Sequence, residues 1–281
     1  MAYAARPILS IITPVRNARK YVASCIESVA AQDCPEVEHI IVDGASTDGT
    51  TAIVSEHAKA RPGLRFIAEP DKGQSDAQNK GIRAAKADYV GILNVDDFYA
   101  PGALRRVVEI IRGLREPRFI HGNCNVLSEG DGLARINRPF LLKFENVVVD
   151  REAWPFPHNP SSYFYPKRLH EEVGYYDVDE HFAMDLKFVL AAIQVIEPLY
   201  IDEVLGNFRL VPGTKTFATV VDGTSEIRQR RIMFDAFLRA PLHTKLRVAS
   251  VMVSRKSRVA YWHLHGRMTR GLGKRHGSAP R

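Results

Sequence analysis

Short runs of aliphatic and β-branched residues alternate with longer amphipathic segments over the first 123 residues of the chain. The short runs have the length of strands, and the longer segments repeat apolar residues at helical spacing. Strands are predicted at Ile8–Thr13, His39–Val42, Leu64–Ala68, Tyr89–Leu93 and Phe119–Gly122. Helices are predicted at Ala18–Ala31, Thr50–Ala60 and Asp76–Ala87. This alternation predicts an α/β fold, with a mostly parallel sheet, right-handed crossovers and helices on both faces.

Polar residues gather where the first four predicted strands end. These ends are Thr13–Asn17, Asp43–Gly49, Glu69–Gly73 and Asn94–Asp97. Each segment alone is also ordinary turn or helix-cap sequence. Ligands of open α/β sheets bind beyond the carboxyl ends of the strands, so the combination favours one binding crevice. The chain has neither the dinucleotide fingerprint Gly-x-Gly-x-x-Gly after its first strand nor a P-loop.

Asp96 and Asp97 are adjacent carboxylates at the end of the fourth predicted strand. Their mutual repulsion disfavours two charges unless a cation is bound between or beside them. Oxygen ligands suit Mg²⁺ or Mn²⁺, which usually take further oxygens from substrate phosphates. The pair therefore predicts a Mn²⁺ or Mg²⁺ site, with Asp96 and Asp97 as ligands and a nucleoside diphosphate as the complement.

The composition is that of an ordinary globular protein, with 281 residues, 45% of them hydrophobic and 25% charged. The three cysteines match neither a disulfide framework nor a metal knuckle, which favours a cytoplasmic location. The short apolar run near the amino terminus lacks the layout of a signal peptide, so export is not expected. The longest apolar stretches, such as Val189–Ile196, are too short to span a bilayer.

Charge is distributed unevenly along the chain. Eleven of the 39 basic residues and none of the 32 acidic residues follow Asp235, so the body carries −4 and the tail +11. The mixed apolar and basic segment Leu246–Met268 suits a helix lying on the inner face of an anionic membrane. It equally suits a helix packed on the domain with a solvated basic face. Gly271–Arg281 has the composition of a disordered segment.

Ordered blocks along most of the chain resemble glycosyltransferase family 2, whose members have the GT-A fold. The resemblance runs from Ser10 to about Lys215. It rests on the blocks Thr13–Asn17, Ile41–Thr50, Gly73–Gly81, Leu93–Asp97 and Ala183–Leu186. It implies a catalytic domain over residues 1–238, with a nucleotide-binding half at 1–123 and an acceptor-binding half at 124–238. Residues 239–281 would then be a helical, basic C-terminal extension with a disordered end.

The resemblance also implies roles for individual residues around the nucleotide. The residues that would bind the nucleotide sugar are Thr13, Pro14, Val15, Asn17, Asp43, Asp71, Asp76, Lys80, Asn94, Val95, Arg209 and Lys215. Asp43 would bond the base, and Arg209 and Lys215 the diphosphate. Asp96 would be the metal ligand of the family's Asp-x-Asp signature, whose first position is Asn94 here. Many relatives carry a histidine where this chain has Val211.

In the second half, the resemblance implies that Asp185 is the catalytic base, although a surface Asp beginning a helix would look the same. Met184 stands where relatives often carry another acidic residue. The Pro-rich aromatic segment Trp154–Ser162 suits either a sugar-stacking loop or a packed connector. His158 and Asn159 are assigned to acceptor-binding or donor-sugar contacts on the resemblance alone.

The function implied is that of a metal-dependent, inverting glycosyltransferase of the hexosyltransferase type (EC 2.4). Its donor would be a UDP-sugar, with GDP- and dTDP-sugars as alternatives, and its acceptor a saccharide or a lipid-linked molecule. Polysaccharide, O-antigen or glycolipid biosynthesis in a bacterial cell envelope is the expected context. A non-catalytic nucleotide-sugar-binding protein is the alternative. Nucleic acid is not expected as a partner, because the body of the chain is acidic.

Overall fold

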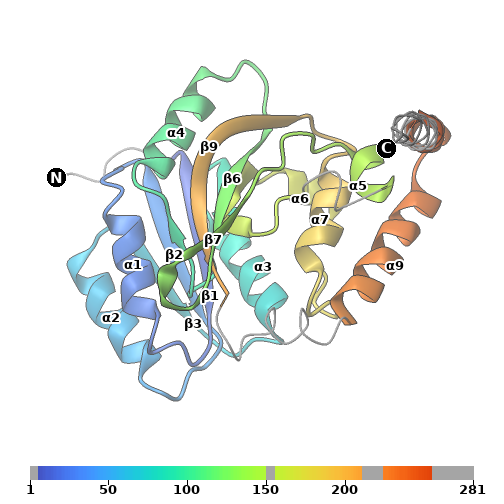
Figure 1. Ribbon diagram of the computed structural model, residues 1–281. Coiled ribbons are helices and arrows are strands. Elements are labelled where there is room, and N and C mark those ends of the chain that lie inside the picture. The colour runs from blue at the N-terminus through green and yellow to red at the C-terminus, as the bar shows by residue number, and fades with distance from the viewer. Residues whose placement is uncertain (1–5, 150–155, 211–223, 255–281) are drawn as a thin grey trace, which may run out of the picture.

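The computed structural model describes residues 6–149, 156–210 and 224–254 (Figure 1). Within these ranges nine strands form one sheet, in the order β3-β2-β1-β4-β8-β6-β9-β5, with β7 paired to β6. Helices cover both faces of this sheet, as the sequence predicts, so the α/β class is confirmed.

The first half of the sheet is parallel. It contains β1 (Leu9–Val15), β2 (Val37–Asp43), β3 (Leu64–Ala68) and β4 (Tyr89–Ile92). The crossovers contain α1 (Val22–Ala30), α2 (Thr50–Ala60) and α3 (Gln74–Ala84). Every predicted strand and helix of this half is present, within four residues at each end. Parallel strands covered on both faces read as unbroken apolar runs, which is why their pattern was clear.

Alternate strand residues face opposite helical layers. Ile12, Ile40 and Ile92 belong to the core cluster that also contains residues of α3 and of the later helix α7 (Met184–Ala192). Leu9 and Ile11, one position out of phase, belong to a second cluster with residues of α1 and of α4 (Ala103–Gly113). The two-residue period of the strands thus separates the core into two layers.

The second half of the sheet is mixed and was not predicted in detail. Its strands are β5 (Phe98–Tyr99), β6 (Phe119–Leu127), β7 (Leu133–Asn137), β8 (Tyr163–Pro166) and β9 (Pro198–Arg209). β8 runs antiparallel to both β4 and β6, whereas β9 runs parallel to β6. The carboxyl end of β9 pairs with β5 directly after the Asn94–Asp97 segment. The continuous parallel arrangement therefore ends at β4.

The remaining helices cover the second half of the sheet. They are α5 (Phe144–Val149), α6 (Leu169–Val173), α7, α9 (Thr224–Arg239), a helix at residues 242–254 and the short turns η1 (Glu129–Asp131) and η2 (Pro160–Ser162). Ala240 and Val248 are buried in the same core cluster as the α7 residues. The packed core thus crosses the predicted domain boundary at 238. Over the described residues, no helix has the length and apolar character needed to cross a bilayer.

We expect Gly81→Ala to destabilise the fold. A Cβ at Gly81 would lie 2.3 Å from the Cγ2 of Ile12, because α3 packs directly on β1. Overpacking of this kind costs about 1–3 kcal/mol of unfolding free energy. Gly113→Ala is the matched control: it lies in helix α4, where an added Cβ meets nothing within 4 Å, and it should stabilise by up to about 1 kcal/mol. Urea unfolding measures both, and equal effects would contradict the close packing of α3.

Candidate functional site

The carboxylate of Asp97 lies at the junction of three segments that are distant in sequence. Its Oδ2 accepts hydrogen bonds from the side-chain amides of Asn94 (3.1 Å) and Asn159 (2.7 Å). Its Oδ1 accepts one from the backbone N–H of Arg209 at 3.0 Å. The side chain is only 1% exposed. Asp97 therefore joins the turn after β4, the start of η2 and the end of β9.

Burial and the neighbouring charge of Asp96 raise the pKa of Asp97 to about 7, against the hydrogen bonds that it accepts. Burial also raises the pKa of Asp96, while its own backbone N–H and the charge of Arg209 lower it. Two adjacent carboxylates whose charged forms are both disfavoured are stabilised by a bound cation. No three Asp, Glu, His or Cys side chains in the described part of the chain are grouped to hold a metal ion. The carboxylate of Asp96 would fit an ion such as Mg²⁺, which takes few ligands from protein and the rest from phosphates and water.

Arg209 extends from the end of β9 across this turn. Its Nη1 donates to the backbone oxygen of Asp96 at 3.1 Å, and its guanidinium lies 4.3 Å from the centre of the Phe98 ring. Its Nε and Nη2 donate to the two carboxylate oxygens of Asp131 in η1, at 2.7 and 3.2 Å. The bond from Arg209 lowers the pKa of Asp131. Arg209, which was predicted to contact the diphosphate, thus lies at the site, but its guanidinium is paired with Asp131, which no sequence motif indicates.

Asp43 at the end of β2 is fully buried and organises its own loop. Its Oδ1 accepts from the N–H and hydroxyl of Ser46, at 3.1 and 2.5 Å, and its Oδ2 from the hydroxyl of Thr51 at 2.6 Å. Asn17, with a φ of 51°, accepts from the N–H of Thr47 at 2.9 Å. The ends of β1 and β2 are therefore held together by side chains of the predicted crevice.

The predicted β1 residues before Asn17 are less accessible. Thr13 is fully buried, and its hydroxyl bonds the Nε2 of His39 at 2.9 Å, so its side chain lies within the sheet and not in the crevice. Pro14 and Val15 are buried as well, and Val95 in the turn after β4 is partly buried among core residues. These positions shape the walls behind the polar side chains.

The end of β3 reaches the β2 loop. A Cβ at Gly44 would lie 2.0 Å from Oδ2 of Asp71, so only glycine admits this approach. The Oδ1 of Asp71 accepts from the N–H of Gly73, whose φ is 123°. Three of the four predicted strand ends are therefore connected, and the fourth is reached through α3.

The first turn of α3 connects the two halves of the site. Gln74 donates to the Oδ1 of Asn94 at 3.0 Å, and the hydroxyl of Ser75 donates to the backbone oxygen of Glu180 at 3.3 Å. Asp76, in the same turn, accepts from the N–H of Lys72 at 3.0 Å. Adjacent residues of one helix thus contact the Asn94–Asp97 turn and the segment that leads into α7.

Lys80 lies one turn further along α3, and acids surround it. Its Nζ is 3.0 Å from Glu69 and 3.6 Å from Asp76, and it donates to the backbone oxygen of Pro70. Burial alone would lower the pKa of Lys80, but the bond to Glu69 and the two negative charges raise it above its ordinary value. Lys80 is therefore a charged group at the rim formed by β3 and α3.

Asp185 occupies the first turn of α7 and is partly buried. The hydroxyl of Tyr163 donates to its Oδ1 at 3.0 Å. Burial raises the pKa of Asp185 to about 6, and the bond from Tyr163 limits that rise. This environment differs from that of a solvated Asp at the start of a helix, because it brings the pKa of the carboxyl closer to neutral pH, where the group can accept and release a proton.

The segment before Asp185 is held by Glu180. Its Oε1 accepts from the backbone N–H groups of Phe182 and Ala183, both at 3.0 Å, and both of its oxygens accept from Nε of Arg228 on α9. Burial would raise the pKa of Glu180, but these bonds lower it. Glu180 therefore fixes the entry into α7 from two sides.

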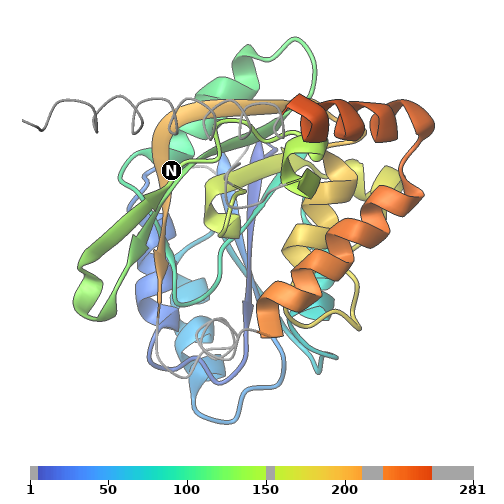
Figure 2. The same cartoon turned by 45° about the vertical axis from the view of Figure 1, so that its right-hand side comes forward.

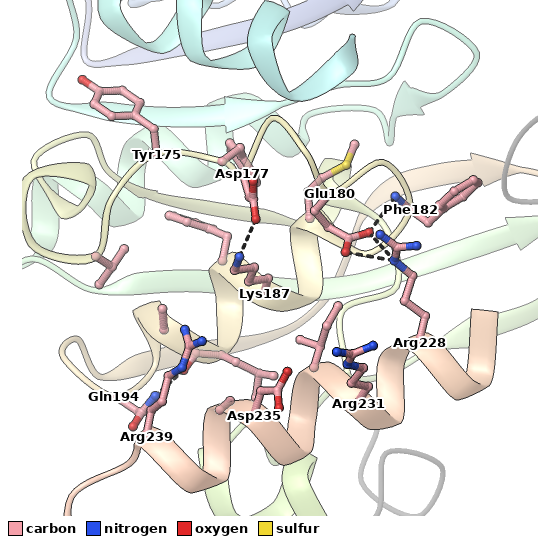
Figure 3. Close-up of a pocket in the computed structure, with 18 of the residues that line it drawn as sticks. Tyr175, Asp177, Glu180, Phe182, Lys187, Gln194, Arg228, Arg231, Asp235 and Arg239 are labelled. Atoms are coloured by element: carbon pink, nitrogen blue, oxygen red, sulfur yellow. Dashed lines mark hydrogen bonds and ion pairs between the residues drawn. The ribbon is translucent and has the colours of Figure 1, made fainter. Parts of the chain in front are cut away.

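A groove of about 990 Å³ lies between α7 and α9, beside this segment (Figure 3). Arg228, Arg231 and Arg239 of α9 line one wall, and Lys187 of α7, which donates to Asp177 at 2.5 Å, lines the other. Met184 and Phe188 lie among its apolar lining. Met184, the residue before Asp185, thus lines the groove, and the charged side chains on the α9 wall are three arginines and Asp235.

The predicted acceptor residues are placed differently from each other. His158 is partly buried, and its ring Nδ1 lies 3.2 Å from Nη2 of Arg135. The backbone N–H of His158 donates to the side-chain oxygen of Asn137. Asn159 is 2% exposed; it donates to Asp97, and its Oδ1 accepts from the N–H of Ser161 at 2.9 Å. The assignment of Asn159 to acceptor contacts is corrected: its amide is used inside the protein, behind the site.

Lys215, Val211 and the residues Trp154 and Pro155 of the Pro-rich segment lie outside the described residues. Sequence reasoning missed Asp131, Tyr163, Glu180 and the role of Asn159. The sequence around Glu180 does contain a usable signal, an acid two and three positions before the N–H groups at the start of a helix. The sequence around Asp131 and Tyr163 contains no such signal, because their partners, Arg209 and Asp185, are 78 and 22 residues away.

The sequence as a whole is similar to known glycosyltransferases. The model of glycosyl transferase family 2 matches residues 10–157. An uncharacterized glycosyltransferase of Mycobacterium tuberculosis (strain CDC 1551) is 31% identical over 205 residues, covering 72% of this chain and 75% of the relative. The putative teichuronic acid biosynthesis glycosyltransferase TuaG of Bacillus subtilis is 36% identical over 160 residues, covering 52% and 64%. The chain spans only 16% of another relative, the chondroitin synthase of Escherichia coli.

Solved structures with a similar fold have low sequence identity to this chain. Staphylococcus aureus TarS 1–349 in complex with UDP has a TM-score of 0.63 at 19% identity, covering 84% of this chain and 67% of that one. The mannosyltransferase PcManGT of Pyrobaculum calidifontis, in complex with GDP-Man and Mn²⁺, has a TM-score of 0.55 at 18% identity, covering 95% and 84%. The fold expected from the sequence is therefore confirmed.

We expect the stability difference between wild type and Asp97→Asn to depend on pH. The pKa of Asp97 is about 7 in the folded state against an ordinary value of 3.8, so between these values the folded protein holds a proton that the unfolded chain has released. The free energy of unfolding of wild type should fall, relative to the variant, as pH rises through this window. The slope is at most about 1.4 kcal/mol per pH unit.

Urea unfolding at several pH values between about 4 and 8 measures this difference. Asp88→Asn is the control, because the side chain of Asp88 is 76% exposed and lies in an exposed ion pair with Arg6. Its difference from wild type should change little over the same range. A pH-independent difference for Asp97→Asn would contradict the elevated pKa.

Proposed function

Because the chain belongs to glycosyl transferase family 2, we propose that it transfers one sugar from a nucleoside diphosphate sugar to an acceptor hydroxyl and inverts the anomeric carbon. The observation that carries this proposal is the arrangement of two acidic centres. Asp96 and Asp97 follow β4, Asp185 begins α7, and Gln74 and Ser75 contact the segments that hold them. A transferase of this class needs both a centre for the diphosphate and a base for the acceptor.

The donor is proposed to bind along the connected strand ends. Asn17 would face the nucleoside, and Asp71, Asp76 and Lys80 would line the ribose and diphosphate side. To contact the base, Asp43 would have to exchange one of its bonds to Ser46 or Thr51. A UDP-sugar is favoured, since TarS is similar in fold and has been crystallised with UDP and with UDP-GlcNAc. A GDP-sugar is the alternative, from the GDP-Man complex of PcManGT.

Asp96 is proposed as the protein ligand of Mn²⁺ or Mg²⁺, with Asn94 toward the ribose. The ion would supply positive charge to the departing diphosphate. Asp97 was predicted as a second ligand, but its three hydrogen bonds favour a different role, in which it holds the turn that displays Asp96. Arg209 supports the same turn through the backbone oxygen of Asp96. To contact the diphosphate, Arg209 would have to exchange Asp131 for a phosphate oxygen.

Asp185 is proposed as the general base that receives the proton of the attacking hydroxyl. A carboxylate of ordinary pKa is a weak base for an alcohol, and burial makes this one stronger by raising its pKa to about 6. The hydroxyl of Tyr163 orients one oxygen and leaves the other for the acceptor. A non-catalytic sugar-nucleotide-binding protein would have no use for a buried carboxyl placed in this way.

The acceptor is proposed to be a saccharide or a lipid-linked molecule that reaches Asp185 from the side of α7, with His158 as a candidate contact. Envelope polysaccharide synthesis is the favoured context, since TuaG is named for teichuronic acid biosynthesis. A peripheral contact of the basic C-terminal segment with the membrane would bring a lipid-linked acceptor to the protein.

We expect Asp185→Asn to reduce turnover by about 10²–10⁴-fold while donor binding is retained, because the amide cannot accept the proton. In wild type, kcat/KM should rise with pH through about 6 and level off once Asp185 is charged. Tyr163→Phe should shift this rise to higher pH, because the bond that it removes lowers the pKa of Asp185. Asp179→Asn, at an exposed position of the same loop, is the control. Near-normal turnover in Asp185→Asn would refute the assignment.

We expect Asp96→Ala to abolish the gain in UDP affinity that Mn²⁺ provides, since the ion would lose its carboxylate ligand. The gain should be more than about tenfold in wild type and in the surface control Asp88→Asn. Titration calorimetry with UDP, with and without Mn²⁺, measures it. An undiminished Mn²⁺ effect in Asp96→Ala would place the ion elsewhere.

A further inference from the structure

Helix α9 has an outward face that is apolar. Ile232, Met233, Ala236 and Phe237 pack on the main core cluster. Ile227, Phe234 and Leu238 follow one another at spacings of seven and four residues, which places them on one face of the helix. They are 75%, 59% and 53% exposed. The helix therefore carries a second, exposed apolar stripe, whose first residue, Ile227, also lies at the groove between α7 and α9.

The helix at residues 242–254 repeats this arrangement. Thr244 and Val248 are buried against the domain. Leu242, Leu246 and Val253 lie at spacings of four and seven residues on another face, and they are 74%, 63% and 65% exposed. Packing on the domain and an outward apolar stripe are thus both features of this helix. The two interpretations of the C-terminal segment left open by the sequence are compatible.

The two helices meet at a corner of the molecule. Figure 2 shows α9 and the helix at residues 242–254 joined by a short turn at the edge of the molecule. The Nζ of Lys245 donates to the backbone oxygen of Leu238 at 2.7 Å, which ties the second helix to the end of the first. The apolar side chains at this corner are Leu238, Leu242 and Leu246.

The sequence of this region is basic. Residues 224–254 contain six Lys or Arg and two acids, and the sequence from 255 to 281 adds eight more Lys or Arg and no acid. The rest of the chain is acidic. Exposed apolar side chains bordered by arginine and lysine are the composition that binds the interface of an anionic bilayer.

We propose that the outward faces of α9 and of helix 242–254 form one docking surface for an anionic phospholipid membrane. The leucine, isoleucine, phenylalanine and valine side chains enter the acyl boundary, and the basic side chains contact the headgroups. A second copy of the chain is a poorer occupant, because a symmetric contact would bring two cationic surfaces together. The groove between α7 and α9 borders the same helix, so a docked protein would hold this groove beside the bilayer.

The test uses the full chain and vesicles of phosphatidylcholine with or without phosphatidylglycerol. We expect wild type to co-sediment with the anionic vesicles and to do so less at high salt. Leu242→Ser/Leu246→Ser should reduce partitioning by more than about tenfold, since both side chains would leave the acyl boundary. Leu133→Ser/Val195→Ser is the matched control: these residues are 59% and 53% exposed on other elements and should leave partitioning unchanged.

Thermal shift with UDP reports folding and donor binding separately, so loss of vesicle binding in a variant that still binds UDP is not a failure of the donor site. Conversely, wild-type vesicle binding without any response to UDP would refute the donor assignment alone. Equal sedimentation of wild type and Leu242→Ser/Leu246→Ser would overturn the proposal. The proposal would also be overturned if wild type did not bind vesicles but formed a concentration-dependent dimer that Leu242→Ser/Leu246→Ser abolished.

Discussion

The buried carboxylate of Asp97 is the constraint on which the rest of the site depends. A group with so little access to water must be satisfied by the protein, and two of its three donors lie 62 and 112 residues further along the chain. The antiparallel return of β9 along β5, the position of η2 and the turn after β4 all meet that requirement. Burial and the neighbouring charge of Asp96 raise the pKa of Asp97 to about 7, and a cation beside Asp96 would instead favour the charged form.

A small number of contacts also connects the proposed acceptor base with the proposed donor site. Gln74 and Ser75 are neighbours in the chain, yet they bond segments on different sides of the crevice. Glu180 continues the connection through the start of α7 to Arg228 on α9. Glu180 therefore links α9 to the segment that carries Asp185.

Predictability differed between the two halves of the chain for a physical reason. In the parallel half, local apolar periodicity is strong because both faces of each strand are covered, and its elements were predicted within a few residues. In the second half, β5, β7, β8 and β9 each pair antiparallel with at least one neighbour, and apolar and polar residues are mixed along their sequences. Their pairing depends on contacts across long stretches of chain, which periodicity does not record.

For the site, the sequence alone determined which residue types lie at the strand ends, because strand ends follow from local periodicity and chemistry from residue identity. Asn94, Asp96 and Asp97 were selected in this way, whereas Asp185, in the first turn of a helix, was assigned only from the family resemblance. Only the tertiary structure decided that Thr13 and Asn159 face inward, that Arg209 pairs with Asp131 and that Tyr163 orients Asp185. The reason is that burial and partner choice are set by elements distant in sequence, and they decide which polar group is left for a ligand.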